Sequence, residues 1–296
     1  MRKTLFILLV SLSNILLGQT HTKVNTDITN GLLLHLDAGN PSSYSGSGIT
    51  WNDLKYVEGM LEMCFHRGPD GYSTYSDGVN ITLGHNLLAI TDDPGISGQP
   101  WKTPKGNILV YNGEIFNYED LCSTFKDKFF PKTKCDTELL AWGLDRFGID
   151  FVKQIDSQHA FAFWNIQENS LALSRDHVGI KPLYYRFRPN GLEFASELKA
   201  LLDGNEEIDE LSKSCLAYTG LNVTRNSFFK GIYRLLPGET QLYRGSELLS
   251  SRRDIVLGTE QENFNQSEFV EEVRLAIHAI LRGVRNKGIF FCGGFV

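Results

Sequence analysis

Two adjacent residues in the middle of the chain could stabilise a negative charge that develops on a reacting oxygen. Asn112 carries a side-chain amide that donates hydrogen bonds without bearing a charge, and Gly113 lets a ligand approach its backbone N–H closely. Together they could form an oxyanion hole, which stabilises the tetrahedral intermediate of acyl transfer. Asn-Gly followed by Glu114 is equally typical of a tight turn, so these residues alone leave both interpretations open.

Asp136 is the second candidate for ligand binding. Its carboxylate could accept charge-assisted hydrogen bonds from the ammonium group of a small molecule. It also precedes a helix-like stretch, 137–147, which Gly148 would end, so the side chain could cap that helix instead. The two roles are compatible because a capping carboxylate leaves one oxygen free.

Two other charged groups are better explained by the framework than by catalysis. Arg67 follows His66 in a turn-like segment and would pair with Asp70 or with loop carbonyls. Asp176 beside His177 resembles part of a catalytic triad. Neighbours on one strand point to opposite faces, however, so this pair cannot form the relay directly.

The candidates lie among short strand-like segments that are separated by turns and accompanied by a few helices. The predicted strands are 107–111, 160–165, 171–175, 183–187 and 192–195, and the predicted helices include 57–65 and 137–147. Many short strands with few helices predict an α+β domain built from layers. We place this domain at residues 57–250.

The composition is that of an ordinary globular protein and excludes several functional classes. Of the 296 residues, 42% are hydrophobic and 22% are charged, and the length suggests roughly two domains. Lys and Arg number 29 against 35 Asp and Glu, so the net charge is −6 and nucleic-acid binding is not expected. The 5 cysteines are too few for a disulfide scaffold, and no metal site is expected. No apolar run reaches the roughly 20 residues that span a bilayer.

The beginning of the chain differs in character from the rest. Residues 1–20 start with Arg2 and Lys3 and continue with a short apolar run, the pattern of a secretory signal peptide. A buried first helix or strand, or an incorrect gene start, is the alternative. Residues 21–56 contain one alternating strand, 32–36, and a Gly/Ser-rich loop, and they resemble the opening of a concanavalin-like β-sandwich. They would imply a secreted or viral structural binding module, but a complete jelly roll needs more strands than fit here.

Several strings in the central region occur in an order that resembles one family. They are HRGPDG (66–71), GHNLLAITD (84–92), Gln99-Pro100, YNGEIFNY (111–118), CDTELL (135–140), FAFWN (161–165), SRDHVGIKPLYY (174–185), FASELKALL (194–202) and FFKGIYRLLPGE (228–239). Together they resemble the glutaminase half of glutamine-hydrolysing asparagine synthetase, a class II glutamine amidotransferase domain. The resemblance extends from about Met60 to Val296. It implies a four-layer αββα N-terminal-nucleophile sandwich of two antiparallel sheets.

The resemblance also implies roles for individual residues. Asn112 and Gly113 would form the oxyanion hole, and Glu114 would line the glutamine site. Asp136 would receive the α-ammonium group of glutamine. Leu87 occupies the place of the arginine that holds the α-carboxylate in the family, and losing such a contact costs about 1.5–3 kcal/mol.

The family's nucleophile is not found in this sequence. Family members use an N-terminal cysteine whose own α-amine acts as the general base. The first cysteine here is Cys64, which lies inside the chain, lacks a free α-amine and is expected to be a half-buried thiol. With Leu87, this predicts impaired glutaminase activity. A catalytically silent small-molecule-binding or docking domain is the alternative.

Residues 251–296 resemble a linker followed by the first helix and strand of the asparagine synthetase ATP-binding domain. Cys292, Gly293 and Gly294 would be the remnant of its phosphate-binding loop, without the helix whose N-terminus holds phosphate. We therefore expect a truncated, chimeric chain. The complete family enzyme uses ATP and Mg²⁺ with glutamine and aspartate as substrates, and no cofactor is expected for this chain alone. The family also suggests a homodimer and a cytoplasmic location, which conflicts with the signal-like start.

Overall fold

A computed structural model describes residues 51–88, 98–189, 191–222 and 224–254, together with helical positions 267, 270, 271, 274 and 275. The signal-like segment, the strand expected at 32–36 and the loop Cys292–Gly294 lie outside the described residues. Within them, no helix is both long and apolar enough to cross a bilayer. The same residues contain no group of three or more His, Cys, Asp or Glu side chains that could hold a metal ion.

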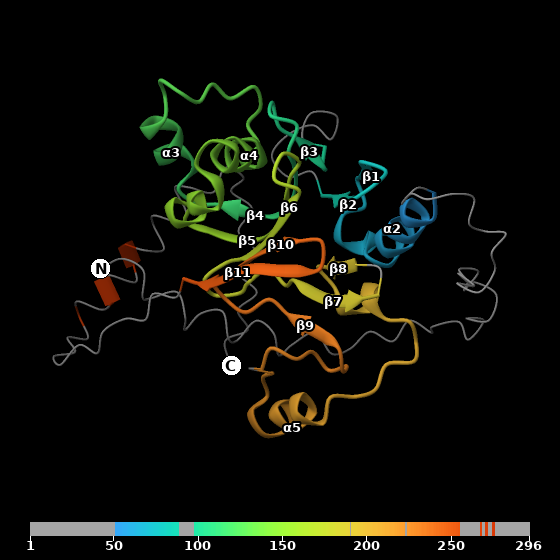
Figure 1. Cartoon of the computed structure of the whole chain (residues 1–296). Helices are drawn as coiled ribbons and strands as arrows, with labels where there is room; N and C mark the ends of the chain where they lie inside the picture. Colours follow the sequence, from blue (N-terminus) through green and yellow to red (C-terminus); the bar gives the residue numbers. More distant parts are fainter. Residues whose placement is uncertain are drawn as a thin grey trace.

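A six-stranded antiparallel sheet forms the centre of the structure (Figure 1). Its spatial order is β11-β10-β6-β5-β4-β3. The strands are β3 (Trp101–Lys102), β4 (Ile108–Ile115), β5 (Ser157–Asn165), β6 (Ser170–Arg175), β10 (Glu239–Arg244) and β11 (Glu247–Arg253). All eight residues of β4 pair with β5, and Gly113 lies opposite His159.

A second layer of strands covers one face of this sheet. It consists of the hairpin β1 (Gly71–Ser76) and β2 (Thr82–Leu87), and of the three-stranded sheet β8 (Gly191–Ala195), β7 (Tyr184–Arg188) and β9 (Ile232–Arg234). Ile108 and Val110 of β4 share one buried cluster with Leu83 of β2, with Leu183 and with Tyr185 of β7. This apolar contact holds the two layers of strands together.

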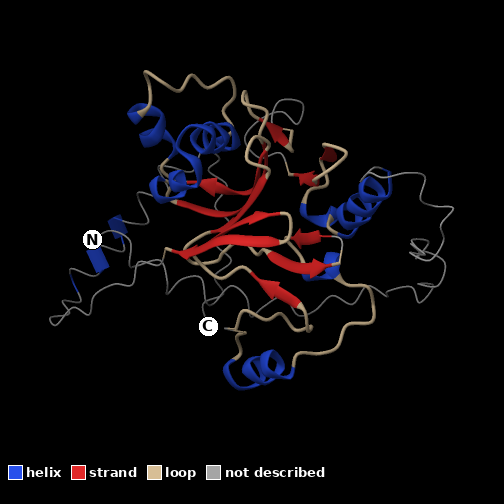
Figure 2. Ribbon diagram, in the orientation of Figure 1, coloured by secondary structure: helices blue, strands red, loops and turns tan. Residues whose placement is uncertain are grey.

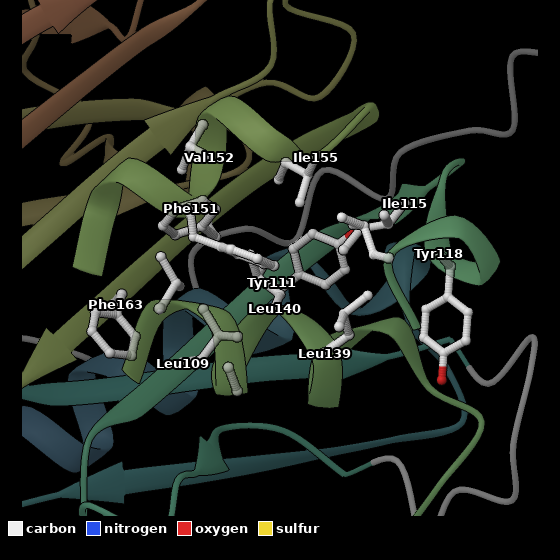
Figure 3. Close-up of a cluster of buried hydrophobic side chains, with 14 of the residues drawn as sticks. Leu109, Tyr111, Ile115, Tyr118, Leu139, Leu140, Phe151, Val152, Ile155 and Phe163 are labelled. Atoms are coloured by element: carbon white, nitrogen blue, oxygen red, sulfur yellow. The ribbon is translucent and has the colours of Figure 1, made fainter. Parts of the chain in front are cut away.

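Helices cover the opposite face of the six-stranded sheet (Figure 2). They are α3 (Tyr118–Thr124), α4 (Asp136–Phe147) and the 3₁₀ segment η3 (Gly148–Gln154). Leu109 and Tyr111 of β4 pack there against Leu140 of α4 and Phe151 of η3 (Figure 3). Gly143 makes this packing possible, because a Cβ atom at that position would lie 2.1 Å from the Phe151 ring.

Helix α2 (Trp51–Met63) packs on the outer side of the β1–β2 hairpin and completes four layers, α, β, β and α. Gly84 of β2 permits this contact, since a Cβ atom there would lie 2.7 Å from Val57 of the helix. The predicted αββα sandwich is therefore confirmed over the described residues. The remaining elements are η2 (Phe65–Arg67), η4 (Leu198–Leu201) and α5 (Glu210–Thr219).

The structure differs most from the expected elements at two boundaries. Helix α2 begins at Trp51 rather than at Val57, so it includes residues that were assigned to the Gly/Ser-rich segment. Strand β4 continues beyond Tyr111 to Ile115. The second difference matters for function, because Asn112 and Gly113 lie in that extension.

Candidate functional site

One edge of β4 is lined by side chains instead of a neighbouring strand. Among the described residues, β3 pairs only with Ile108 and Leu109. Beyond them, the Tyr111 N–H donates to Gln99 Oε1 at 2.7 Å, and the Ile115 N–H donates to Asp136 Oδ2 at 3.0 Å. We call the side of Tyr111–Ile115 that faces away from β5 the β4 edge.

The N–H of Gly113 faces this same edge. Backbone N–H groups along a strand point alternately to the two sides, so residues 111, 113 and 115 share one direction. Phe116, an even-numbered neighbour, donates in the other direction, to the carbonyl of Asp156 at 2.7 Å. The Gly113 N–H therefore lies between the groups that bind Gln99 and Asp136, where it can donate to a ligand oxygen.

The turn interpretation of Asn112-Gly113 is wrong, because both residues lie within β4. Gly113 is required by packing, since a Cβ atom there would lie 2.3 Å from the carbonyl oxygen of Gln158. The Asn112 side chain is on the same face of β4 as Val110, the face toward the second layer, and Glu114 shares that face. The side-chain amide of Asn112 and the backbone N–H of Gly113 therefore come from adjacent residues of β4.

Asp136 is placed beside this stretch by α4. Its Oδ2 atom accepts hydrogen bonds from the Ile115 N–H and, at 3.0 Å, from the Tyr111 hydroxyl. Burial raises the pKa of Asp136, while hydrogen bonds from Ile115, Tyr111 and the backbone of Thr137 oppose the shift. The helix cap is Cys135, which makes no side-chain capping bond. The other oxygen, Oδ1, lies 3.9 Å from the Cys135 thiol and is the atom that a ligand ammonium group could approach.

Gln99 is a site residue whose role the sequence did not reveal. Besides accepting from the Tyr111 N–H, it donates from Nε2 to the Tyr111 carbonyl at 3.0 Å. The only signal in the sequence is that Gln99-Pro100 belongs to the family-like strings. Its contact partner is twelve residues away along the chain, and no local pattern predicts such a pairing.

Leu87 lies on the face of β2 that is turned toward β4. Leu83 of the same strand is buried against β4, and alternation gives residues 83, 85 and 87 a common face. His85 confirms this orientation, because its Nε2 atom lies 3.2 Å from the Tyr111 carbonyl. An apolar side chain therefore stands beside the β4 edge at the position where the resemblance places an arginine.

His85 is neutral in this environment. Burial lowers its pKa to about 4, and the carbonyl of Tyr111 makes Nε2 the donor atom. Its Nδ1 atom is then an acceptor, and it is buried without a hydrogen-bond partner among the described residues. The ring thus supports the Tyr111 carbonyl without adding charge to the site.

Cys64 has the properties of a structural thiol. It follows α2 and is joined to Met63 by a peptide bond, so its nitrogen is an amide; this N–H donates to the carbonyl of Leu61 at 3.0 Å. Burial raises the pKa of the thiol, and the nearby charge of Glu197 raises it further. A thiolate is therefore disfavoured at Cys64.

The other charged groups have structural roles, but Arg67 pairs with Glu197, a partner that the sequence did not suggest, and Asp176 and His177 follow β6 instead of lying within a strand. Arg67 Nη1 lies 3.3 Å from Glu197 Oε1. The Asp176 carboxylate accepts backbone N–H groups from four residues, His159, Val178, Ile180 and Lys181. His177 Nδ1 lies 2.6 Å from the Asp254 carbonyl, so Asp176 and His177 form no relay with each other.

Comparison with known proteins identifies the domain that carries this site. Residues 45–252 match the family model described as the glutamine amidotransferase domain. The chain belongs to the glutamine amidotransferase family. The order of the strings in the sequence, from HRGPDG onward, places it with the class II members that have an N-terminal-nucleophile fold.

Similar proteins include both amidases and asparagine synthetases. Amidase chry2 of Gibberella zeae is 31% identical over 210 residues, covering 69% of this chain and 31% of the relative. Asparagine synthetase [glutamine-hydrolyzing] 2 of Bacillus subtilis is 30% identical over 260 residues, covering 80% of this chain and 34% of the relative. The chain thus spans about a third of the length of these relatives.

A solved structure of glutamine phosphoribosylpyrophosphate amidotransferase from B. subtilis is also similar to the chain. It superposes with a TM-score of 0.48 and 18% sequence identity, covering 67% of this chain and 46% of that chain.

Proposed function

We propose that the amidotransferase domain binds glutamine at the β4 edge and is built to release ammonia from its side-chain amide. The observation that carries the proposal is the position of Asp136, whose carboxylate is bonded to Ile115, two residues from Gly113. An anion that can receive an ammonium group and a donor that can receive a carbonyl oxygen therefore share one strand edge.

The reaction would use these groups in a fixed order. Asp136 would hold the α-ammonium group of glutamine, and the Gly113 N–H with the Asn112 amide would hold the carbonyl oxygen of the side-chain amide. When a nucleophile bonds to the amide carbon, the oxygen becomes negative and these donors stabilise it. The C–N bond then breaks, the nitrogen takes up a proton and leaves as ammonia, and water releases glutamate from the acyl intermediate.

We further propose that this chain turns glutamine over slowly. The described cysteines are Cys64, Cys122, Cys135 and Cys215, and each lies inside the chain, so none offers the free α-amine of an N-terminal nucleophile. Leu87 favours a second candidate function, a domain that retains ligand binding without catalysis. Its apolar side chain beside the β4 edge supplies no charge for an α-carboxylate.

Asparagine synthesis is a proposal for the whole protein, by analogy with the asparagine synthetase relatives. It would require aspartate, ATP and Mg²⁺, and a homodimer is the assembly to test. Cys292, Gly293 and Gly294, the proposed remnant of an ATP loop, lie outside the described residues.

Replacing Asp136 tests the proposed glutamine site. Asp136→Asn keeps an oxygen that can accept from Ile115 and Tyr111 but removes the charge, so calorimetry should show glutamine affinity falling about tenfold or more. Asp120→Asn on α3 is the control, and it should bind like the unmodified chain. Glutamate release by the unmodified chain should not exceed that by a Cys64→Ala variant. Unchanged affinity in Asp136→Asn, or turnover that depends on Cys64, would contradict the proposal.

A further inference from the structure

The carboxamide of Gln99 takes the place of a missing strand at the β4 edge. Its Oε1 atom accepts from the Tyr111 N–H at 2.7 Å, and its Nε2 atom donates to the Tyr111 carbonyl at 3.0 Å. One planar group thus satisfies both backbone groups that a paired strand would satisfy. Gln99 is only 7% exposed, so water cannot easily replace these bonds.

The same side chain connects the two parts of the candidate site. Tyr111 directly precedes Asn112, and Gln99 Nε2 also lies 3.4 Å from Oγ1 of Thr137, which directly follows Asp136. Gln99 is itself held in place, because the Ser73 hydroxyl donates to its backbone carbonyl at 2.5 Å. Gln99 therefore contacts both β4 and α4, in addition to the direct hydrogen bonds from Tyr111 and Ile115 to Asp136.

We propose that Gln99 is a positioning residue that fixes the distance between the oxyanion donors and the carboxylate of Asp136. The proposal rests on the proposed glutamine site. A ligand held at both ends tolerates little error in that distance, because binding and reaction depend on preorganised groups. The role requires a donor and an acceptor on one side chain of this length. Glu lacks the donor, Met lacks both, and Asn is one methylene group shorter.

The chain offers a matched control at the other end of β4. Asn107 is 3% exposed and also joins β4 to α4, because its Nδ2 atom donates to Asp145 Oδ1 at 2.8 Å. Its Oδ1 atom accepts from the Ile166 N–H at 3.0 Å, so it too makes two bonds through one carboxamide. Gln99→Met and Asn107→Leu therefore each remove one buried carboxamide that bridges the same strand and helix.

Binding and stability together test the proposal. Both variants should lower the Tm, because each leaves buried polar groups without partners. Measured well below either Tm, glutamine affinity should fall about tenfold or more in Gln99→Met and change less than twofold in Asn107→Leu. Gln99→Glu should resemble Gln99→Met at neutral pH. Equal affinity losses in Gln99→Met and Asn107→Leu would show that Gln99 is merely structural.

Amide NMR keeps this test separate from the proposed function. In the ligand-free chain, the Gly113 and Ile115 amide signals should shift in Gln99→Met and remain in place in Asn107→Leu. If the unmodified chain does not bind glutamine but these shifts occur, the proposed glutamine site fails and the positioning by Gln99 stands. If glutamine binds and the Gly113 signal does not respond to Gln99→Met, the positioning role is overturned.

Discussion

The two halves of β4 differ in the partners of their backbone hydrogen bonds along the edge that faces away from β5. Residues 108–110, the scaffold half, are buried and lie beside β3 and between two apolar clusters. Residues 111–115, the site half, have the side chains of Gln99, His85 and Asp136 along the edge where a strand could pair. A paired strand bonds every outward N–H group along an edge, whereas the side chains here bond those of Tyr111 and Ile115. One strand thus contributes to the core at one end and to the candidate site at the other.

The scaffold half should respond most strongly to loss of apolar volume. Leu109→Ala removes a side chain that is 0% exposed, and it should lower the free energy of unfolding by about 2–5 kcal/mol in urea denaturation. Leu248→Ala on β11, at a site that is 47% exposed, should cost less than about 0.5 kcal/mol. Leu109 would not belong to the scaffold half if Leu109→Ala lowered the free energy of glutamine binding by more than it lowered the free energy of unfolding.

Acid should weaken the structure around the site half through two buried histidines that adjoin it. Burial lowers the pKa of His85 on β2, which contacts the Tyr111 carbonyl, and of His159 on β5, which lies opposite Gly113, to about 4 from 6.5. Between about pH 6.5 and pH 4, these histidines are protonated in the unfolded chain but not in the folded chain. The free energy of unfolding therefore decreases as the pH falls through this range. For each histidine, a pKa difference of this size corresponds to a loss of about 3 kcal/mol in the free energy of unfolding when titration is complete.

A pH series of urea denaturation curves measures this effect. His85→Gln preserves a donor for the Tyr111 carbonyl and removes one titrating group, so the acid-induced loss between these pH values should shrink by roughly half. If the free energy of unfolding of His85→Gln falls with pH as steeply as that of the unmodified chain, His85 does not contribute to the acid sensitivity.

Gly113 should tolerate no side chain. In Gly113→Ala the new methyl group would meet the carbonyl oxygen of Gln158, so we expect a loss of about 1–3 kcal/mol in stability together with loss of glutamine binding. Gly59→Ala in α2, where no atom lies within 4 Å of the added Cβ, should instead gain about 0.4–1 kcal/mol. Normal glutamine binding by a folded Gly113→Ala variant would refute the assigned role of the β4 edge.

The smallest expected effect is a gain of affinity at Leu87. Leu87→Arg should raise the affinity for glutamine about tenfold, because a guanidinium group can pair with the α-carboxylate. It should not raise the affinity for glutamine α-amide, which has no carboxylate. Leu88→Arg is the matched control, since Leu88 is 52% exposed and adjacent in sequence. Equal gains from both variants would indicate nonspecific attraction.

The sequence predicted the scaffold half better than the site half. The run Asn107–Tyr111 indicated a buried strand, because burial on both faces produces a continuous apolar segment. Asn112, Gly113 and Glu114 have turn-forming or polar side chains, so local propensity would have ended the strand before them. They stay in β4 because it pairs with β5 along its whole length, and that pairing is not encoded locally.

The site residues were predictable to the extent that each carries recognisable chemistry. Asn112, Gly113 and Asp136 were predicted because they lie in family-like strings and because their donors and carboxylate suit an amide substrate with an ammonium group. Gln99 was missed because its function depends on contacts with Tyr111 and Thr137, which only folding brings close. Residues that position other residues carry a weaker signal in a single sequence than residues that touch a ligand.

The two-point attachment of α4 has a mechanical consequence. Asp136 near its start is bonded to Ile115, and Asp145 near its end is bonded to Asn107, so the helix is fastened to both ends of β4. Rotation or sliding of the helix would break one of these fastenings. We therefore expect α4 and β4 to move together as one rigid unit. Any adjustment to a bound molecule is then expected in β2, which ends at Leu87 beside the β4 edge.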